Sequence, residues 1–206
     1  MTARKQTVIG LTGPMCAGKN QAAEILEQRG FLVIDADQTA RRAMDAVEKD
    51  VLAAFGTEAA EKDIILTTKE GKIDRRQLGK LLFGNQQLLA RHEAIIYPEI
   101  DRLLNEYIDS NTDKTVVINA PLLYKSNVLA RCVFVIYIDA PFIIRFLRAS
   151  KRDTLPPSQI IDRFRAQNNL YAQYISRNVD ILKVSNSGTL RVLKRRLEKQ
   201  LESRGY

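Results

Sequence analysis

The sequence of 206 residues is poor in the residues that build disulfide frameworks and zinc sites, with two cysteines and one histidine. Cys16 and Cys132 lie far apart, which fits a reducing cytoplasm better than a disulfide framework. His92 has no nucleophile at a suitable spacing and no cluster of zinc ligands around it, so we expect it to be structural or exposed. No apolar run approaches the roughly 20 residues that span a bilayer, and the N-terminal run is too short for a secretory signal. The composition predicts a cytoplasmic protein that does not enter the membrane.

Acidic residues are fewer than basic ones, 24 against 32, so the chain carries a net charge of +8. This balance indicates partners with negative charge, either nucleic acid or phosphorylated small molecules. The basic residues are spread along the chain without interleaved aromatics or zinc-finger spacing, so we expect no nucleic-acid partner. The most basic stretch, 191–204, has leucines at helical spacing, which predicts an amphipathic helix with a solvated charged face. These leucines are Leu190, Leu193, Leu197 and Leu201.

Short apolar and β-branched runs predict several buried strands. The strands are expected at 7–12, 31–34, 115–118 and 133–138, with a weaker one at 181–184. Between about 41 and 109 the strand signal is lost, and apolar residues recur at helical spacing instead. Strands that alternate with helices indicate a parallel sheet with right-handed crossovers. The sequence therefore predicts an α/β fold, with a parallel sheet flanked by helices and one helical insertion.

Residues 13–20 read Gly-Pro-Met-Cys-Ala-Gly-Lys-Asn and match the phosphate-loop template G-x-x-x-x-G-K-S/T at every position but the last. In such a loop, backbone N–H groups and the lysine bind nucleotide phosphates, and the final hydroxyl binds magnesium. A strand before the loop and a helix at 21–29, ended by Gly30, supply the setting that the motif requires. The alternative is an ordinary strand-to-helix turn with an exposed lysine. We expect a nucleotide site in which Lys19 and the N–H groups of residues 14–20 hold the phosphates.

Asp35 and Asp37 follow the second predicted strand. One of them could instead cap a helix that begins at Gln38. Ligands of parallel sheets bind at the carboxyl ends of the strands, where the loop, the two aspartates, Pro121-Leu122 and Asp139 would meet. We therefore expect at least one of the two carboxylates to reach the acceptor of a phosphoryl group, with the other orienting metal or water.

Arg145, Arg148 and Arg152 lie three and then four residues apart on a predicted helix, so they share one face. In an enzyme that transfers phosphate, such arginines neutralise the charge that develops on the phosphoryl group. The alternative is a solvated basic face. Pro156-Pro157 is expected to break this helix and to mark a mobile segment.

These features together resemble the dephospho-coenzyme A kinase family, over nearly the whole chain. The most specific part is the phosphate loop followed, one helix later, by Val33-Ile34-Asp35-Ala36-Asp37 and Ala40-Arg41, whereas the loop alone is shared by many families. Further matches are Leu11-Thr12-Gly13, Ile73-Asp74-Arg75-Arg76 with Leu78 and Phe83, a helix that ends near Tyr97-Pro98, Pro121-Leu122-Leu123, Arg148 with Arg152-Asp153, Ala166-Gln167 and Asn186-Ser187-Gly188.

The resemblance implies transfer of the γ-phosphoryl group of ATP, with Mg²⁺, to the ribose 3′-hydroxyl of dephospho-coenzyme A, the final step of coenzyme A synthesis. It also implies a nucleotide-binding core formed by residues 1–40 and 110–206. A helical lobe at 41–109 would help to hold dephospho-coenzyme A, and a short lid at about 146–165 would close over the site.

The resemblance also implies roles for individual residues. Asp37 would be the catalytic base, and Lys19 and Arg148 would be the catalytic cations. The residues expected to bind ATP are Gly13, Pro14, Met15, Cys16, Ala17, Gly18, Lys19, Asn20, Gln21, Arg152, Asn186 and Gly188, with the last two beside the adenine. The residues expected to bind the acceptor are Thr12, Asp35, Arg41, Arg75, Leu78, Pro121 and Leu122.

Three residues depart from the family pattern: Asn20 stands where the family has serine or threonine, Tyr97 replaces a histidine, and Lys125 replaces a common glutamate. The amide oxygen of Asn20 is an acceptable but neutral ligand for magnesium. Direct binding, binding through a water and no binding therefore remain open. We hypothesise that activity survives with a weaker dependence on magnesium at Asn20. The alternatives are another phosphate-loop nucleoside or nucleotide kinase and a degenerate relative that binds nucleotide without catalysis. The oligomeric state is not predicted.

Overall fold

The computed structural model describes residues 6–206, which divide into two compact units. The first unit comprises the residues up to Asp35 together with Tyr107–Tyr206, and the second comprises Ala36–Glu106. Among the described residues, both cysteines are free thiols, and no helix is long and apolar enough to cross a bilayer.

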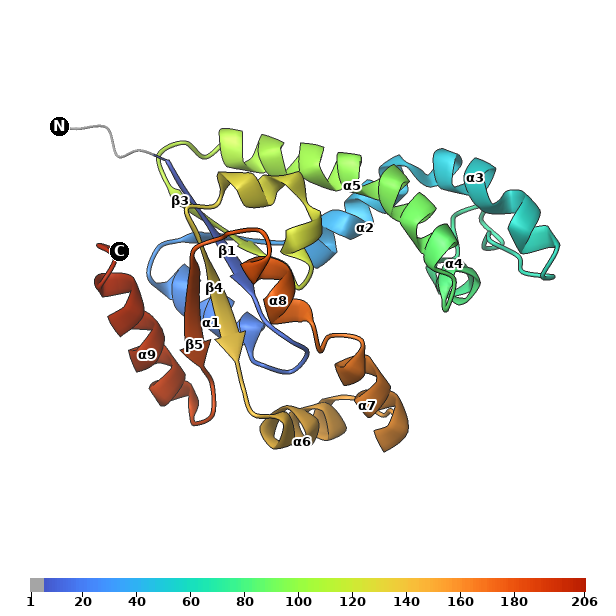
Figure 1. Cartoon of the computed structure of the whole chain (residues 1–206). Coiled ribbons are helices and arrows are strands. Elements are labelled where there is room, and N and C mark those ends of the chain that lie inside the picture. Colours follow the sequence, from blue (N-terminus) through green and yellow to red (C-terminus); the bar gives the residue numbers. More distant parts are fainter. Residues whose placement is uncertain (1–5) are drawn as a thin grey trace. The chain divides into compact units, whose positions relative to one another are not determined.

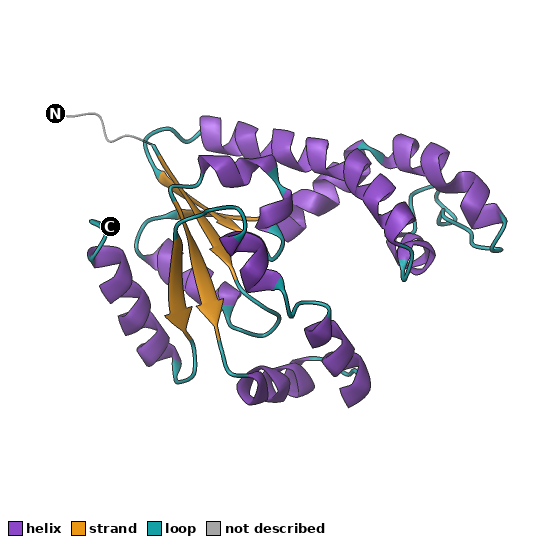
Figure 2. Ribbon diagram, in the orientation of Figure 1, coloured by secondary structure: helices purple, strands orange, loops and turns teal. Residues whose placement is uncertain are grey.

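The first unit is built on a five-stranded sheet in the order β2-β3-β1-β4-β5. Every neighbouring pair of strands is parallel, and Figure 2 shows the strands in orange with helices around them. The strands are β1 (Thr7–Thr12), β2 (Leu32–Asp35), β3 (Thr115–Asn119), β4 (Phe134–Asp139) and β5 (Ile181–Ser185). The predicted parallel α/β fold is confirmed.

The register of the strands determines which residues meet at the carboxyl edge of the sheet. Asn119 ends β3 opposite Leu11 of β1 on one side and opposite Asp35 of β2 on the other. Thr12 ends β1, and Asp139 ends β4 opposite Ser185 of β5. Because successive side chains of a strand point to opposite faces, Asp35, Asn119 and Leu11 lie on one face of the sheet and Thr12 lies on the other.

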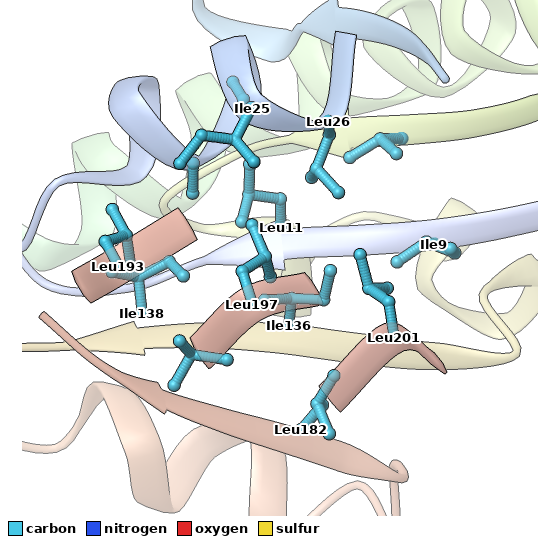
Figure 3. Packing of buried hydrophobic residues seen from close by; sticks show 14 of the residues in the cluster. Ile9, Leu11, Ile25, Leu26, Ile136, Ile138, Leu182, Leu193, Leu197 and Leu201 are labelled. Carbon is cyan, nitrogen blue, oxygen red and sulfur yellow. The ribbon is translucent and has the colours of Figure 1, made fainter. Parts of the chain in front are cut away.

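One face of the sheet is covered by α1 (Lys19–Gln28) and α9 (Leu190–Glu202), whose apolar side chains meet those of β1, β4 and β5 (Figure 3). Leu193, Leu197 and Leu201 are buried as their spacing predicts, whereas Leu190 at the start of α9 is 51% exposed. The helix α1 ends before Gly30, whose positive φ of 86° lets the chain turn into β2. The predicted amphipathic C-terminal helix is confirmed.

The rest of the first unit consists of short helices. They are η1 (Leu123–Lys125), η2 (Asn127–Arg131), α6 (Phe142–Arg152), α7 (Pro157–Arg165) and α8 (Leu170–Ile175), and the three α-helices are labelled in Figure 1. The prediction that Pro156-Pro157 breaks α6 is wrong, because α6 already ends at Arg152. Pro157 instead takes the first position of α7, where proline fits because the first N–H groups of a helix have no partner within it.

The second unit is helical, with α2 (Ala36–Ala46), α3 (Glu48–Ala60), α4 (Arg75–Leu82) and α5 (Gln86–Asp109), of which α5 continues into the first unit. Asp37 does not cap a helix at Gln38, because α2 already begins at Ala36 and Asp37 lies in its first turn. The expected helix end near Tyr97-Pro98 is also wrong, because α5 continues through Pro98. A proline inside a helix removes one backbone hydrogen bond, and the buried Ile96 and Ile100 on either side of it provide packing that compensates.

Candidate active site

The phosphate loop joins β1 to α1 and depends on two glycines. Gly13 and Gly18 have φ angles of 150° and 103°, which side-chain-bearing residues rarely adopt. A Cβ atom on Gly13 would collide with the carbonyl oxygen of Ile138, and one on Gly18 would collide with the side chain of Asn186. The loop therefore runs so close to the end of β4 and to Asn186 that only glycine fits at these two positions.

Not every residue of the loop has an N–H group available for phosphate. Pro14 has none, and the N–H of Ala17 donates to the Pro14 carbonyl at 3.0 Å. The N–H of Met15 donates to Oε1 of Gln167 at 2.7 Å. Of the residues predicted at 14–20, Pro14 therefore cannot donate, and the N–H groups of Met15 and Ala17 already donate within the protein. Lys19 and Asn20 begin α1, so they lie at the positive end of the helix dipole.

Arg148 and Asn186 support the loop through its carbonyl groups. Nδ2 of Asn186 donates to the Ala17 carbonyl at 2.8 Å. Nη1 of Arg148 donates to the carbonyls of Cys16 and Ala17, each at 3.3 Å, and Nη2 donates to the carbonyl of Asn186 at 3.2 Å. In this structure the Arg148 guanidinium holds loop backbone, so its predicted contact with a phosphoryl group requires it to exchange or share these partners.

The other two arginines of α6 have different surroundings. The guanidinium of Arg145 lies over the ring of Phe164, 4.6 Å from the centroid, and its Nε has no partner among the described residues. Arg152 is exposed and pairs with Asp153 at 2.8 Å, an interaction that lowers the pKa of the Asp153 carboxyl. The three arginines share a helix face as predicted, but only Arg148 contacts the loop through a described hydrogen bond.

Asn119 lies directly beside the two residues that end the loop motif. Nζ of Lys19 donates to Oδ1 of Asn119 at 3.3 Å, and Nδ2 of Asn119 donates to Oδ1 of Asn20 at 3.3 Å. Asn119 is only 5% exposed. Sequence analysis alone did not identify it, although a polar residue that ends a buried strand two residues before Pro121 was a usable signal.

Thr12, an expected acceptor-binding residue, uses its hydroxyl within the protein. The hydroxyl donates to the Pro121 carbonyl at 3.2 Å and accepts from the Tyr174 hydroxyl at 3.0 Å. Tyr174 is buried, and this burial raises the pKa of its phenol. Thr12 therefore joins β1 to the segment after β3 and to α8. Tyr174 is a supporting residue that the sequence did not indicate, whereas Gln167 belongs to a stretch quoted for the family resemblance, where it was given no role.

The remaining expected residues of the first unit are placed as follows. Asp35 is half-buried at the end of β2, Leu122 is 38% exposed after Pro121, and Gln21 and Gly188 are exposed. Asp139 pairs with Lys183 at 2.9 Å. Lys125, one of the departures from the family pattern, is half-buried at the end of η1.

The helical unit contains a mainly apolar cavity of about 270 Å³. Three of the residues expected to bind the acceptor, Arg41, Arg75 and Leu78, line it together. The guanidinium of Arg75 donates to Asp45 at 2.6 Å and to the Arg41 carbonyl at 3.0 Å. The other lining residues are Ala40, Met44, Gly79, Leu82, His92 and Ile96. Asp37 is exposed one turn before Arg41 on α2.

His92 is half-buried and contributes to the wall of this cavity. Its Nε2 atom is buried and has no hydrogen-bond partner among the described residues. Burial lowers the pKa of the imidazole below its ordinary value of 6.5. Tyr97, five residues further along α5, is also half-buried. Nothing in the residue spacing indicated that the only histidine would face a cavity.

A parallel sheet whose first strand runs through a phosphate loop into a helix defines a phosphate-loop nucleotide-binding protein. A sequence model described as dephospho-CoA kinase matches residues 7–190. The chain belongs to the dephospho-CoA kinase family, so the family resemblance seen in the sequence is confirmed.

Individual relatives agree with this assignment over almost their full lengths. A dephospho-CoA kinase of Treponema denticola is 39% identical over 203 residues, which cover 97% of this chain and 91% of the relative. A dephospho-CoA kinase of Treponema pallidum is 37% identical over 201 residues, which cover 96% and 95%. The crystal structure of TT1252 from Thermus thermophilus superimposes with a TM-score of 0.79 at 28% identity, covering 97% of this chain and 98% of that one.

Proposed function

We propose that this chain transfers the γ-phosphoryl group of ATP to the 3′-hydroxyl of dephospho-coenzyme A, the final step of coenzyme A synthesis. The observation that carries the proposal is the family match over residues 7–190, which includes both the phosphate loop and the helical unit with its cavity. We further propose that the protein acts in the cytoplasm and on small molecules, without a nucleic-acid partner.

The phosphate loop is proposed to hold the β- and γ-phosphates of ATP. Lys19 supplies a positive charge at the start of α1, and the N–H groups of Cys16, Gly18 and Asn20 supply hydrogen-bond donors. The Asn186 and Arg148 contacts with the loop carbonyls fix the loop before the nucleotide arrives. Phosphoryl transfer depends on positioning and charge stabilisation, so a loop that is held in place lowers the cost of reaching the transition state.

The cavity of the helical unit is proposed to hold part of the acceptor. Its apolar wall, formed by Met44, Leu78, Leu82 and Ile96, suits the uncharged arm of dephospho-coenzyme A. Arg41 and Arg75 line the same cavity, so two guanidinium groups lie beside the apolar wall, where the phosphates of the acceptor could bind. Arg75 also pairs with Asp45. The helical unit, Ala36–Glu106, overlaps most of the lobe predicted at 41–109 and would thus act as an acceptor lobe.

Asp37 is proposed as the general base that orients the 3′-hydroxyl and accepts its proton. It is an exposed carboxylate in the first turn of α2, the helix that also carries Arg41. Asp35, two residues earlier, ends β2 opposite Asn119 at the carboxyl edge of the sheet. A base of this kind must come within hydrogen-bonding distance of the hydroxyl when both substrates are bound.

Residues 146–165 are proposed to form a lid over the loop. Ile160 and Phe164 of α7 pack with Ala149 of α6, and Met15 and Cys16 of the loop join this apolar cluster. This packing supports the proposal, because the residues proposed as a lid contact the loop through the same cluster. Closure of such a lid excludes water, which otherwise competes with the acceptor for the phosphoryl group.

The proposal is tested by measuring ADP release from ATP with a panel of acceptors. We expect ADP release with dephospho-coenzyme A. With coenzyme A, whose 3′-position is already phosphorylated, and with adenosine, we expect ADP release no faster than without an acceptor. Equal release with adenosine would indicate a nucleoside kinase. No release with any acceptor, together with retained ATP binding, would indicate a non-catalytic relative.

The acceptor cavity makes a separate prediction for His92. We expect the imidazole to titrate below pH 6.5 in the folded protein, because its burial lowers the pKa. The unfolded chain then binds more protons than the folded one below about pH 6.5, so stability falls as the pH drops through this value. Dephospho-coenzyme A should move the His92 resonance, whereas ATP alone should not. Because His92 is the only histidine, NMR of the untagged protein reads this group directly.

The control for this titration is His92→Gln, which should remove the histidine resonance and reduce the loss of stability between about pH 7 and pH 5. A midpoint at or above 6.5 would contradict the effect of burial on the pKa of the imidazole. A resonance that responds to ATP and not to dephospho-coenzyme A would contradict the assignment of the cavity to the acceptor.

A further inference from the structure

Two asparagines meet at the end of the phosphate loop, the part of such loops at which magnesium is held. In phosphate-loop enzymes the last residue of the loop motif supplies a hydroxyl, and an aspartate on a separate strand supplies a carboxylate. Here Asn20 is the last residue of the motif. Asn119 ends β3, the neighbour of β1 in the sheet, on the face that carries α1. The last residue of the motif and its partner at the end of β3 therefore both carry a neutral amide.

The two amides bind to each other and to the loop lysine. Nδ2 of Asn119 donates to Oδ1 of Asn20, and Nζ of Lys19 donates to Oδ1 of Asn119, each at 3.3 Å. Both side-chain oxygens thus already accept a hydrogen bond. Asn119 is only 5% exposed, so its amide is held between β3 and the start of α1. The three side chains form one connected group, the Lys19–Asn119–Asn20 network.

This donor set does not fit the magnesium site of the class. Magnesium is a hard cation that prefers carboxylate and phosphate oxygens in near-octahedral geometry. The network contributes no negative charge, and Lys19 adds a positive one. Of the carboxylates that end strands at this edge, Asp139 pairs with Lys183 at 2.9 Å, and Asp35 ends β2 opposite Asn119.

We infer that the Lys19–Asn119–Asn20 network replaces the hydroxyl–carboxylate magnesium pair, so that this loop binds ATP with an affinity that depends little on magnesium. Asn119 is a positioning residue in this account, because it fixes the side chains of Lys19 and Asn20 where they meet the nucleotide. Magnesium that enters with ATP is held by the phosphates and by water. The inference rests on the ATP-binding part of the proposed function and requires nothing of the acceptor.

The test is calorimetric titration of the full chain with the β,γ-imido analogue of ATP, in excess Mg²⁺ and again in EDTA. For the natural chain we expect the two dissociation constants to agree within about threefold. The double variant Asn20→Thr with Asn119→Asp restores the hydroxyl and the carboxylate. We expect Mg²⁺ to tighten binding to the double variant by about tenfold or more, the scale of one charge-assisted contact.

The matched control is Asn178→Asp, which makes the same chemical change in the turn before β5, at the opposite edge of the sheet. For this control, the ratio of the dissociation constant in EDTA to that in Mg²⁺ should equal the ratio for the natural chain. A natural chain that binds the analogue tenfold or more tightly with Mg²⁺ would overturn the inference. If Asp35→Asn then abolished that gain, Asp35 would be the magnesium ligand. A double variant with no gain from Mg²⁺ would also overturn the inference.

The same titrations distinguish a failure of this inference from a failure of the proposed function. Binding that depends strongly on Mg²⁺ would refute the inference while leaving the kinase proposal intact. A chain that fails to bind the analogue in both buffers would refute the ATP site itself, and both proposals with it.

Discussion

Replacement of Asp37 by asparagine is expected to lower kcat with dephospho-coenzyme A by about 10²- to 10⁴-fold, the range typical for loss of a general base. Asparagine keeps the size of the side chain but cannot accept the proton of the 3′-hydroxyl. Asp37 is exposed in the first turn of α2 and belongs to the helical unit, whereas the phosphate loop belongs to the other unit. ATP affinity should therefore stay within about threefold of the natural value, as measured by calorimetry.

The control for Asp37→Asn is Asp50→Asn. Asp50 is an exposed carboxylate in the first turn of α3, in the same unit. The Asp50→Asn variant therefore loses the same kind of interaction with a helix dipole as the Asp37→Asn variant. We expect this variant to keep full turnover. Robust turnover by the Asp37 variant would remove the residue from the catalytic role, and equal losses in both variants would point to destabilised helices instead.

The second large effect is expected for Lys19→Ala. The Lys19 ammonium is the positive charge at the end of the loop motif, and Asn119 fixes it from the neighbouring strand. Without this charge, the γ-phosphoryl group loses a preorganised donor during transfer. We expect kcat/KM for ATP to fall by about 10²- to 10³-fold, as for other single donors of this kind. Steady-state measurement at saturating dephospho-coenzyme A reads this directly.

Lys114→Ala is the control for this variant. Lys114 is an exposed lysine just before β3, at the opposite edge of the sheet from the loop, so its removal lowers the net charge equally. Its kinetic constants should match those of the natural chain. A Lys19 variant with unchanged kcat/KM would show that the loop does not hold the reacting phosphates.

Much of the fold was predictable because its signals are local. The five strands are short apolar runs, and the loop between β1 and α1 needs its glycines at Gly13 and Gly18 for reasons of backbone geometry. The spacing of Leu193, Leu197 and Leu201 was enough to predict the buried face of α9. Prolines were less reliable guides to where helices end. Pro98 lies inside α5 and Pro157 begins α7, because packing and position in the helix decide what a proline does.

The candidate site was predictable only in part, because its supporting contacts join residues far apart in sequence. Asn119 contacts Lys19 across 100 residues, Gln167 contacts Met15 across 152, and Tyr174 contacts Thr12 across 162. No spacing rule connects such pairs. The motif located Lys19 and Asn20, but it could not show that a second asparagine meets them or that Arg148 donates to the loop carbonyls.

The most direct test of the central claim is the identity of the product made from ATP and dephospho-coenzyme A. The account predicts a product that carries one added phosphate on the ribose 3′-oxygen and is indistinguishable from authentic coenzyme A by chromatography, mass and ³¹P NMR. A phosphate at another position, or free inorganic phosphate in place of a phosphorylated acceptor, would contradict the account.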